Sequence, residues 1–160
     1  MPRNTILLWL FVIALGLDIG AGIYEARIVV PLWSAGVPET LAAGNPYGRV
    51  AIDAGIRFWS IMTSLVAILA LVTLVSSFRT PAPLRTWQIV ASVAELAAVA
   101  MTLLYFRPVL VRLFMGHGEG LSTEAIRSTV GLWVMWSRVR IVVSLVAWCA
   151  AIQALVLSGR

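Results

Sequence analysis

The sequence has few of the side chains on which most soluble enzymes depend. Only 12% of its 160 residues are charged, none is lysine, and there is one cysteine and one histidine. Cys149 alone cannot form a dithiol relay, because thiol–disulfide exchange needs paired cysteines. His117 alone cannot supply a bis-histidine haem or a histidine-rich di-iron site, and we interpret it, beside Glu119, as an inert loop residue. The sequence therefore predicts no cofactor and no metal site, and it offers no Ser-His-Asp constellation.

What the sequence has in excess is apolar residues. They make up 61% of the chain, and the mean hydropathy is +0.96. This composition is typical of an integral membrane protein in contact with the lipid bilayer. The net charge of +5 comes from arginine alone, and no basic cluster is interleaved with aromatic residues. We therefore predict no nucleic-acid partner.

Four apolar runs are long enough to cross a membrane. They cover about residues 5–30, 55–78, 86–106 and 130–157. The first run follows a basic residue, Arg3, as the apolar core of a signal peptide does. Because this run reaches the full length of a membrane span, we treat it as the first transmembrane helix and not as a cleaved signal. The sequence predicts an all-α fold: a single four-helix transmembrane bundle covering residues 1–160.

The connections between these helices are unequal. The turn at 80–83 is short, which makes the second and third helices antiparallel neighbours. The segments 31–54 and 108–129 are long and lie on the same side of the membrane. They are either lids over an entrance or solvated connectors.

The basic N-terminus favours cytoplasmic placement of both termini. The use of arginine without lysine, with abundant Ala, Val and Leu, fits a high-GC coding bias and a bacterial plasma membrane. The number of copies is left open, and a homo-oligomer is one arrangement open to such a bundle.

Ionisable residues inside the spans are the most informative feature, because a charge in hydrocarbon is costly and marks function. They are Asp18, Glu95, Arg138 and Arg140. At about 1.5 Å per residue, these residues lie roughly 12 to 18 Å from the end of the bundle that carries the long segments. The two carboxylates and two guanidiniums would then form one mutually neutralising layer.

Helical spacing gives each predicted helix a polar face. The four faces are Asp18, Gly22 and Glu25; Asp53, Arg57, Ser60 and Ser64; Gln88, Ser92, Glu95 and Thr102; and Trp133, Trp136, Arg140 and Ser144. Gly16 and Gly20, opposite the first face, predict a second close contact. Most polar residues lie in the half near the long segments, which predicts a cavity opening there and packed aliphatic side chains below it.

Arg138 and Arg140 are about 200° apart on a helical wheel, so their side chains cannot both point toward the same site. We expect Arg140, on the tryptophan stripe, to face the interior and Arg138 to pair at an interface or to snorkel. An aromatic ring beside a buried guanidinium suits recognition of a flat, electron-rich ligand. The alternative is purely structural: the charges specify helix pairing.

Three segments resemble a known family. They are Ala21-Gly22-Ile23-Tyr24-Glu25-Ala26-Arg27-Ile28-Val29-Val30-Pro31-Leu32-Trp33, residues 102–113 with Pro108, and Trp136-Ser137-Arg138-Val139-Arg140. Together they resemble the DUF1772, or anthrone oxygenase-like, family of small four-helix membrane proteins. The chain has Arg107-Pro108-Val109-Leu110 where the family pattern favours an asparagine after the proline.

The resemblance implies a cofactor-independent oxygenase, a monooxygenase-type oxidoreductase acting on an anthrone-like aromatic or polyphenolic substrate. Glu25 or Asp18 would be the base, and Arg140 or Arg57 would hold the anion. Trp33, Trp59 and Trp136 would flank the ring, and Tyr24 would bind the substrate with them. Two other classes stay open: a transporter or ligand-binding protein for a small molecule, and a non-enzymatic membrane subunit.

Overall fold

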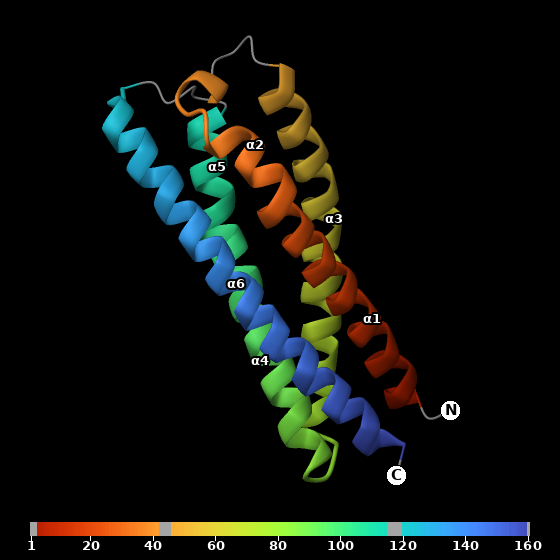
Figure 1. Ribbon diagram of the computed structural model, residues 1–160. Coiled ribbons are helices and arrows are strands. Elements are labelled where there is room, and N and C mark those ends of the chain that lie inside the picture. Colours follow the sequence, from red (N-terminus) through yellow and green to blue (C-terminus); the bar gives the residue numbers. More distant parts are fainter. Residues whose placement is uncertain (1–2, 42–45, 115–119, 160) are drawn as a thin grey trace.

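The computed structural model describes residues 3–41, 46–114 and 120–159, which form four long helices and no strand (Figure 1). The first helix comprises α1 (Arg3–Tyr24), the π-helical segment η1 (Glu25–Val29) and α2 (Val30–Ser34). A short 3₁₀ turn, η2 (Glu39–Leu41), follows it. The second helix is α3 (Pro46–Ser77). The third comprises α4 (Leu84–Met101), the π-helical segment η3 (Thr102–Phe106) and α5 (Arg107–Phe114), and the fourth is α6 (Thr123–Ser158).

Each long helix contains a segment long and apolar enough to cross a membrane. These segments are Thr5–Ser34, Gly55–Ser77, Leu84–Phe114 and Thr123–Ser158. The outer surface carries large apolar side chains such as Ile61 and Leu104, which are 73% and 80% exposed. Lipid is the solvent that suits such a surface, because the helices satisfy their own backbone hydrogen bonds. The predicted all-α transmembrane bundle is confirmed as a fold.

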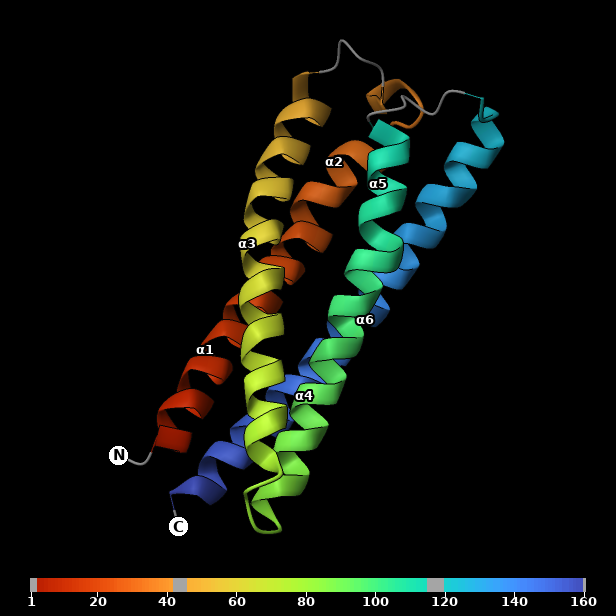
Figure 2. The same cartoon turned by 180° about the vertical axis from the view of Figure 1, so that it is seen from behind.

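The helices form a ring in which α1 packs against α3 and α6, and α4 packs against the same two helices. Both termini lie at one end together with the turn between α3 and α4, which we call the turn end (Figures 1 and 2). The other two connections lie at the opposite end, which we call the loop end. The predicted antiparallel pairing of the second and third helices is therefore present.

The helices run further toward the loop end than the sequence predicted. The first continues through Pro31 to Ser34, and the third continues through Pro108 to Phe114. Each proline follows a π-helical segment by two residues. A proline removes one N–H from the helical ladder, and a π turn lets the ladder realign without breaking the helix. The connections at the loop end are accordingly shorter than the predicted 31–54 and 108–129.

The fourth helix also starts earlier than predicted, at Thr123. Ser122 caps it, because its Oγ accepts a hydrogen bond from the backbone N–H of Ala125 at 3.2 Å. Gly120, with φ of 76°, provides the preceding turn in a conformation that favours glycine. The first two turns of α6 are polar, which hides them from a hydropathy pattern.

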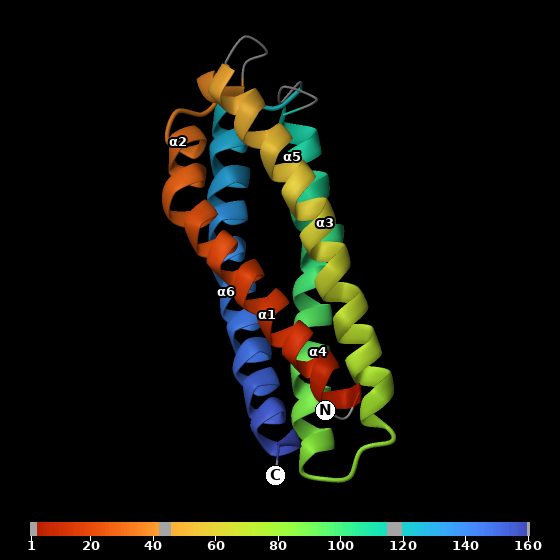
Figure 3. The same ribbon diagram turned by 90° about the vertical axis from the view of Figure 1, so that its right-hand side faces the viewer.

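The buried side chains of α6 recur at alternating intervals of four and three residues. They include Ile126, Val130, Trp133, Ser137, Arg140, Ser144, Ala147, Ala151 and Ala154. This seam is typical of helices packed knobs into holes at shallow crossing angles. Toward the loop end, α2 and α6 lie on one side of the bundle, and α3 and α5 lie on the other (Figure 3).

Candidate functional site

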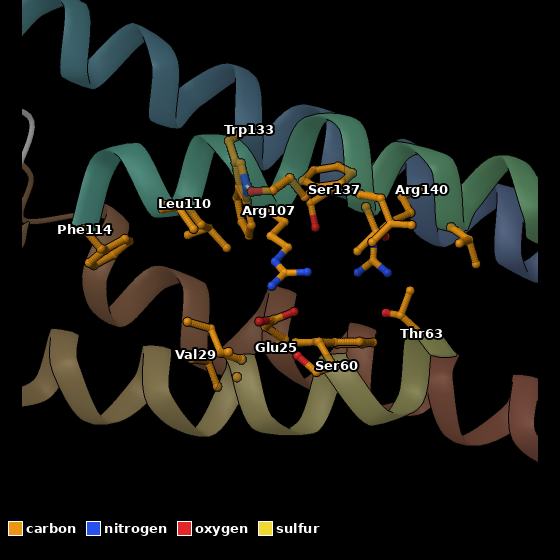
Figure 4. A pocket seen from close by; sticks show the side chains of 18 of the residues that line it. Glu25, Val29, Ser60, Thr63, Arg107, Leu110, Phe114, Trp133, Ser137 and Arg140 are labelled. Carbon is orange, nitrogen blue, oxygen red and sulfur yellow. Dashed lines mark hydrogen bonds between the residues drawn. The ribbon is translucent and has the colours of Figure 1, made fainter. Parts of the chain in front are cut away.

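A cavity of about 530 Å³ lies in the half of the bundle toward the loop end (Figure 4). Its walls come mainly from α3 and from the helix α4–η3–α5, with further residues from η1, α2 and α6. The polar and aromatic side chains that line it include Glu25, Trp33, Trp59, Phe106, Arg107, Trp133, Ser137 and Arg140. The cavity therefore has the size and mixed character of a small-molecule site.

The cavity opens sideways, between helices. Although α3 packs against α4, it has little contact with α5. Ser60 and Ser64 on α3, and Leu103 and Val111 on the opposite wall, line the cavity and are exposed. Since the outer surface of these helices has the apolar character that suits lipid, the opening lies on the side of the bundle that a bilayer would cover.

Arg140 lies at the inner end of the cavity and is only 8% exposed. Its guanidinium carbon is 5.0 Å from the centre of the Trp59 ring and 5.5 Å from that of Phe106. Stacking on aromatic rings compensates part of the cost of burying the charge. No ion pair within 4 Å joins Arg140 to any carboxylate in the described part of the chain, so its N–H groups remain available to a ligand.

Two carboxyl groups lie behind Arg140, away from the cavity. Asp18 on α1 is 4% exposed and Glu95 on α4 is 2% exposed. Both are in electrostatic contact with Arg140, and Glu95 is also in contact with Asp18. Ser144 lies beside Glu95, although its Oγ does not reach hydrogen-bond geometry. The predicted layer of opposite charges from three helices is present, without Arg138, which is exposed.

Glu25 and Arg107 extend into the cavity from opposite walls (Figure 4). Glu25 is the first residue of η1, and its carboxylate interacts with the indole of Trp59 on α3. A Cβ on Gly55 would lie 3.9 Å from Glu25 Oε1, so the carboxylate reaches across to the backbone of α3. Arg107 is exposed and is the first residue of α5.

Aromatic rings form a fixed wall on the side of α2, α5 and α6. Trp133 packs edge to face against Trp33 and Phe106, with both pairs of ring centres 5.5 Å apart. Phe114 packs in the same way against Trp33, at 5.2 Å. Trp133 Nε1 also donates a hydrogen bond to the Phe106 carbonyl at 3.4 Å. Such contacts hold the rings in place and leave an apolar surface for a flat ligand.

The structure brings together five of the eight predicted site residues. Glu25, Trp33, Trp59 and Arg140 line the cavity, and Asp18 lies next to Arg140. Tyr24 is 60% exposed, Trp136 is 43% exposed, and Arg57 is exposed as well. None of these three lines the cavity.

The prediction that Trp136 faces the interior is wrong. It came from a straight helical wheel at 100° per residue, on which Trp136 lies beside Arg140. The buried seam of α6 instead passes from Trp133 through Ser137 to Arg140 and leaves Trp136 on the outside. The side chain of Asp53, and therefore its pairing with Arg57, lies outside the described residues, as do His117 and Glu119.

Sequence reasoning missed Thr63, Phe106, Arg107 and Ser137 as lining residues. Ser137 could have been found from the alternating four-and-three spacing of α6. Phe106 and Arg107 lie next to Pro108, where the sequence predicted a helix end. Membrane helices tolerate proline, so a helix extended through Pro108 would have placed Phe106 and Arg107 on the wall of the bundle.

Two glycines of α1 provide a matched test of packing beside the cavity. A Cβ on Gly22 would lie 3.6 Å from Ile141 Cγ1 and 3.9 Å from an Arg140 nitrogen, whereas one on Gly20 meets nothing within 4 Å. We expect Gly22→Leu to displace Arg140 and to cost about 1–3 kcal/mol of stability. Gly20→Leu should leave stability unchanged. Thermal unfolding in detergent measures both, and equal midpoints would contradict the described packing.

Gly16, like Gly22, makes a close approach: a Cβ there would lie 3.5 Å from Trp148 Nε1 on α6. Trp148 in turn donates a hydrogen bond to the Val12 carbonyl at 3.0 Å, which ties α6 to α1. The predicted second contact face of the first helix is thus present at Gly16. It is wrong at Gly20, which is exposed.

The fold and the cavity define a class: a four-helix membrane protein with a lipid-accessible aromatic pocket that contains one buried guanidinium. Comparison with protein-family models, with curated proteins and with solved structures finds no match. The residues of the cavity are therefore the basis on which a function can be assigned.

Proposed function

We propose that this protein is a cofactor-independent oxygenase of the membrane that converts a flat, lipid-soluble phenolic substrate of the anthrone type into a quinone. The observation that carries the proposal is the joint presence of Glu25 and Arg140 in one aromatic cavity open to lipid. A base and an anion-binding cation are the two groups that this reaction needs from a protein.

The shape and lining of the cavity support an aromatic substrate. A volume of about 530 Å³ accommodates a three-ring molecule. Trp33, Phe106 and Trp133 offer apolar faces, while Trp59 lies over Arg140 at the inner end. A ligand that partitions into lipid would enter between α3 and α5 without crossing water.

The chemistry balances without a further reactant. The Glu25 carboxylate removes a proton from the ring methylene, and the keto oxygen takes the negative charge as a phenolate. The electron-rich carbanion transfers an electron to O₂, and the radical pair combines to form a C–O bond at that carbon. Glu25 returns its proton to the resulting peroxide anion. The hydroperoxide then loses water together with the remaining hydrogen on that carbon, so that the methylene becomes a carbonyl. One O₂ is consumed, one oxygen atom stays in the quinone and the other leaves as water.

The positive groups have distinct parts in this scheme. Arg140 donates hydrogen bonds to the phenolate oxygen as charge develops on it, in a site where little water competes. Arg107, nearer the loop end, attracts an anionic or phenolic group at the mouth. Asp18 and Glu95 lie behind Arg140 and hold its side chain in position.

The membrane placement that accompanies the proposal follows the basic N-terminus. Both termini and the turn end would face the cytoplasm of a bacterial plasma membrane, and the loop end would face the opposite side. At about 1.5 Å per residue, Glu25 lies roughly 14 Å below the end of α2, so the chemistry would take place within the bilayer.

The test is oxygen uptake by purified protein in lipid nanodiscs with 1,8-dihydroxyanthrone. We expect consumption of one O₂ per quinone formed, at a rate proportional to protein and far above that of empty nanodiscs. Uptake no faster than in empty nanodiscs, with protein that is folded, would refute the oxygenase.

Ligand binding without turnover is the second candidate, because the aromatic cavity and Arg140 suit recognition as well as catalysis. It would be identified by saturable quenching of tryptophan fluorescence by the anthrone with no oxygen uptake. Transport is less favoured, since the cavity ends at Arg140 above a packed core of Phe11, Val66 and Ala91.

A further inference from the structure

Unpaired polar atoms continue below the cavity, toward the turn end. Six buried oxygen and nitrogen atoms there have no hydrogen-bond partner in the described part of the chain. They belong to Thr73, Gln88, Ser92, Glu95 and Ser144, whose exposed fractions are 2% or less. The sequence predicted packed aliphatic side chains in this half. Such a core is present, but it encloses a polar column.

Atoms of this kind need partners. Nearly all buried polar groups in native proteins are hydrogen-bonded, because an unpaired group in an apolar interior is strongly destabilising. A cluster of five such side chains would consume much of the small net stability of a domain this size. Lipid offers no donor or acceptor, so water is the partner that remains.

The spacing of these groups suits single water molecules. On α4, Gln88, Ser92 and Glu95 recur at four and three residues and so share one face. Their separations along the helix axis are about 6 and 4.5 Å. One water that accepts or donates two hydrogen bonds of about 2.8 Å spans a gap of this size.

The column has two defined ends. Thr73 lies one helical turn before the end of α3 and Gln88 one turn after the start of α4, so both are at the same level near the turn end. Buried Ser77 and Thr80 follow at the turn itself. At the other end, Glu95 is in electrostatic contact with Asp18 and Arg140.

We propose that a file of water molecules occupies this column, enters from the turn end, and supplies protons to Asp18 and Glu95 and water to the Arg140 guanidinium from the side of the membrane opposite the loop end. The charged groups at its inner end come from three helices: Asp18 on α1, Glu95 on α4 and Arg140 on α6. From the described part of α3 the column receives two hydroxyl groups and no charge, those of Thr73 and Ser77. The water file does not depend on what the cavity binds.

Hydrogen–deuterium exchange of the glutamine side chains tests directly whether water reaches the column. The chain has two glutamines, buried Gln88 and exposed Gln153, which α6 presents on its outer surface. Protein with ¹⁵N-labelled glutamine side chains is reconstituted in phosphatidylcholine vesicles and moved into D₂O, and Gln153→Leu assigns the two solid-state NMR signals. We expect the Gln88 carboxamide protons to exchange within hours. Their persistence for days would overturn the water file.

The point of entry is tested with Thr73→Val, which keeps the shape of the side chain and removes its hydroxyl. It should slow Gln88 exchange about tenfold, the factor that one lost hydrogen bond implies. Ser76→Ala is the matched control, because the Ser76 hydroxyl already donates to the Thr73 carbonyl at 2.9 Å. If Ser144→Ala slows exchange and Thr73→Val does not, water enters from the cavity and the proposed direction is wrong.

Thermal unfolding separates a wet column from a dry one. If water bridges the groups, Gln88→Leu leaves the remaining groups without their partner and lowers the midpoint. A dry column predicts the reverse, because replacing an unpaired polar side chain by an apolar one is stabilising. A raised midpoint in both Gln88→Leu and Thr73→Val would overturn the proposal.

Discussion

Replacing Arg140 with leucine is expected to weaken binding of the anthrone about 10- to 100-fold, the range for hydrogen bonds made by a charged group. It should also lower the midpoint of thermal unfolding, because Asp18 and Glu95 would lose the buried cation with which they interact electrostatically. Titration of tryptophan fluorescence in nanodiscs measures the first effect, and thermal unfolding measures the second.

Two further variants separate recognition from structure. Arg138→Leu makes the same change two residues away on the exposed side of α6, so binding and stability should be retained. Arg140→Lys keeps the charge but loses the planar fork and its stacking on Trp59. It should fold and bind weakly. If Arg140→Lys binds normally while Arg140→Leu fails to fold, Arg140 is a structural residue, as the helix-pairing alternative holds.

Replacing Glu25 with glutamine is expected to reduce oxygen uptake by about 100-fold or more, the usual contribution of a general base. The glutamine has the same shape and still offers an oxygen to the Trp59 indole. Binding of the quinone product should therefore change little. Oxygen uptake and product binding, measured on the same nanodisc preparation, report the two quantities independently.

Glu124→Gln is the matched control, because Glu124 is exposed in the first turn of α6, away from the cavity lining. Its uptake should equal that of the unaltered protein. Asp18→Asn distinguishes the two candidate bases. Asp18 lies behind Arg140 and does not line the cavity, so this variant should mainly lower the yield of folded protein. Loss of turnover in Asp18→Asn alone, with full turnover in Glu25→Gln, would assign the base to Asp18.

The sequence was sufficient for the four-helix bundle because each span is a long apolar run, a signal that lipid imposes directly. Glu25 and Arg140 were also predictable, since charges within such runs cannot face lipid. The comparison of depths along straight helices placed Arg140 level with Asp18 and Glu95, whereas Glu25 followed from its helical spacing to Asp18. An error of one turn in either placement is small relative to the length of the cavity.

The helix ends near Pro31 and Pro108 were not predictable in the same way. A proline ordinarily ends a helix. Only the backbone conformation shows that a π-helical turn before each proline lets the helix continue. The start of α6 fell in a polar stretch, although Ser122 followed by Glu124 is a recognisable capping signal. Trp136 was misplaced because Trp136 and Ser137 lie on opposite sides of Arg140, at about 40° and 60° on a helical wheel, and the wheel alone does not show on which side the buried seam passes.

Under the proposed function, the sideways mouth between α3 and α5 sets the concentration scale on which this protein would work. A molecule that enters from the bilayer is presented at its mole fraction in lipid, and its concentration in water matters only through partitioning. We expect added empty vesicles, at a fixed total amount of ligand, to dilute it within the membrane and to lower occupancy of the cavity. The apparent affinity would then be a shared property of the protein and its membrane.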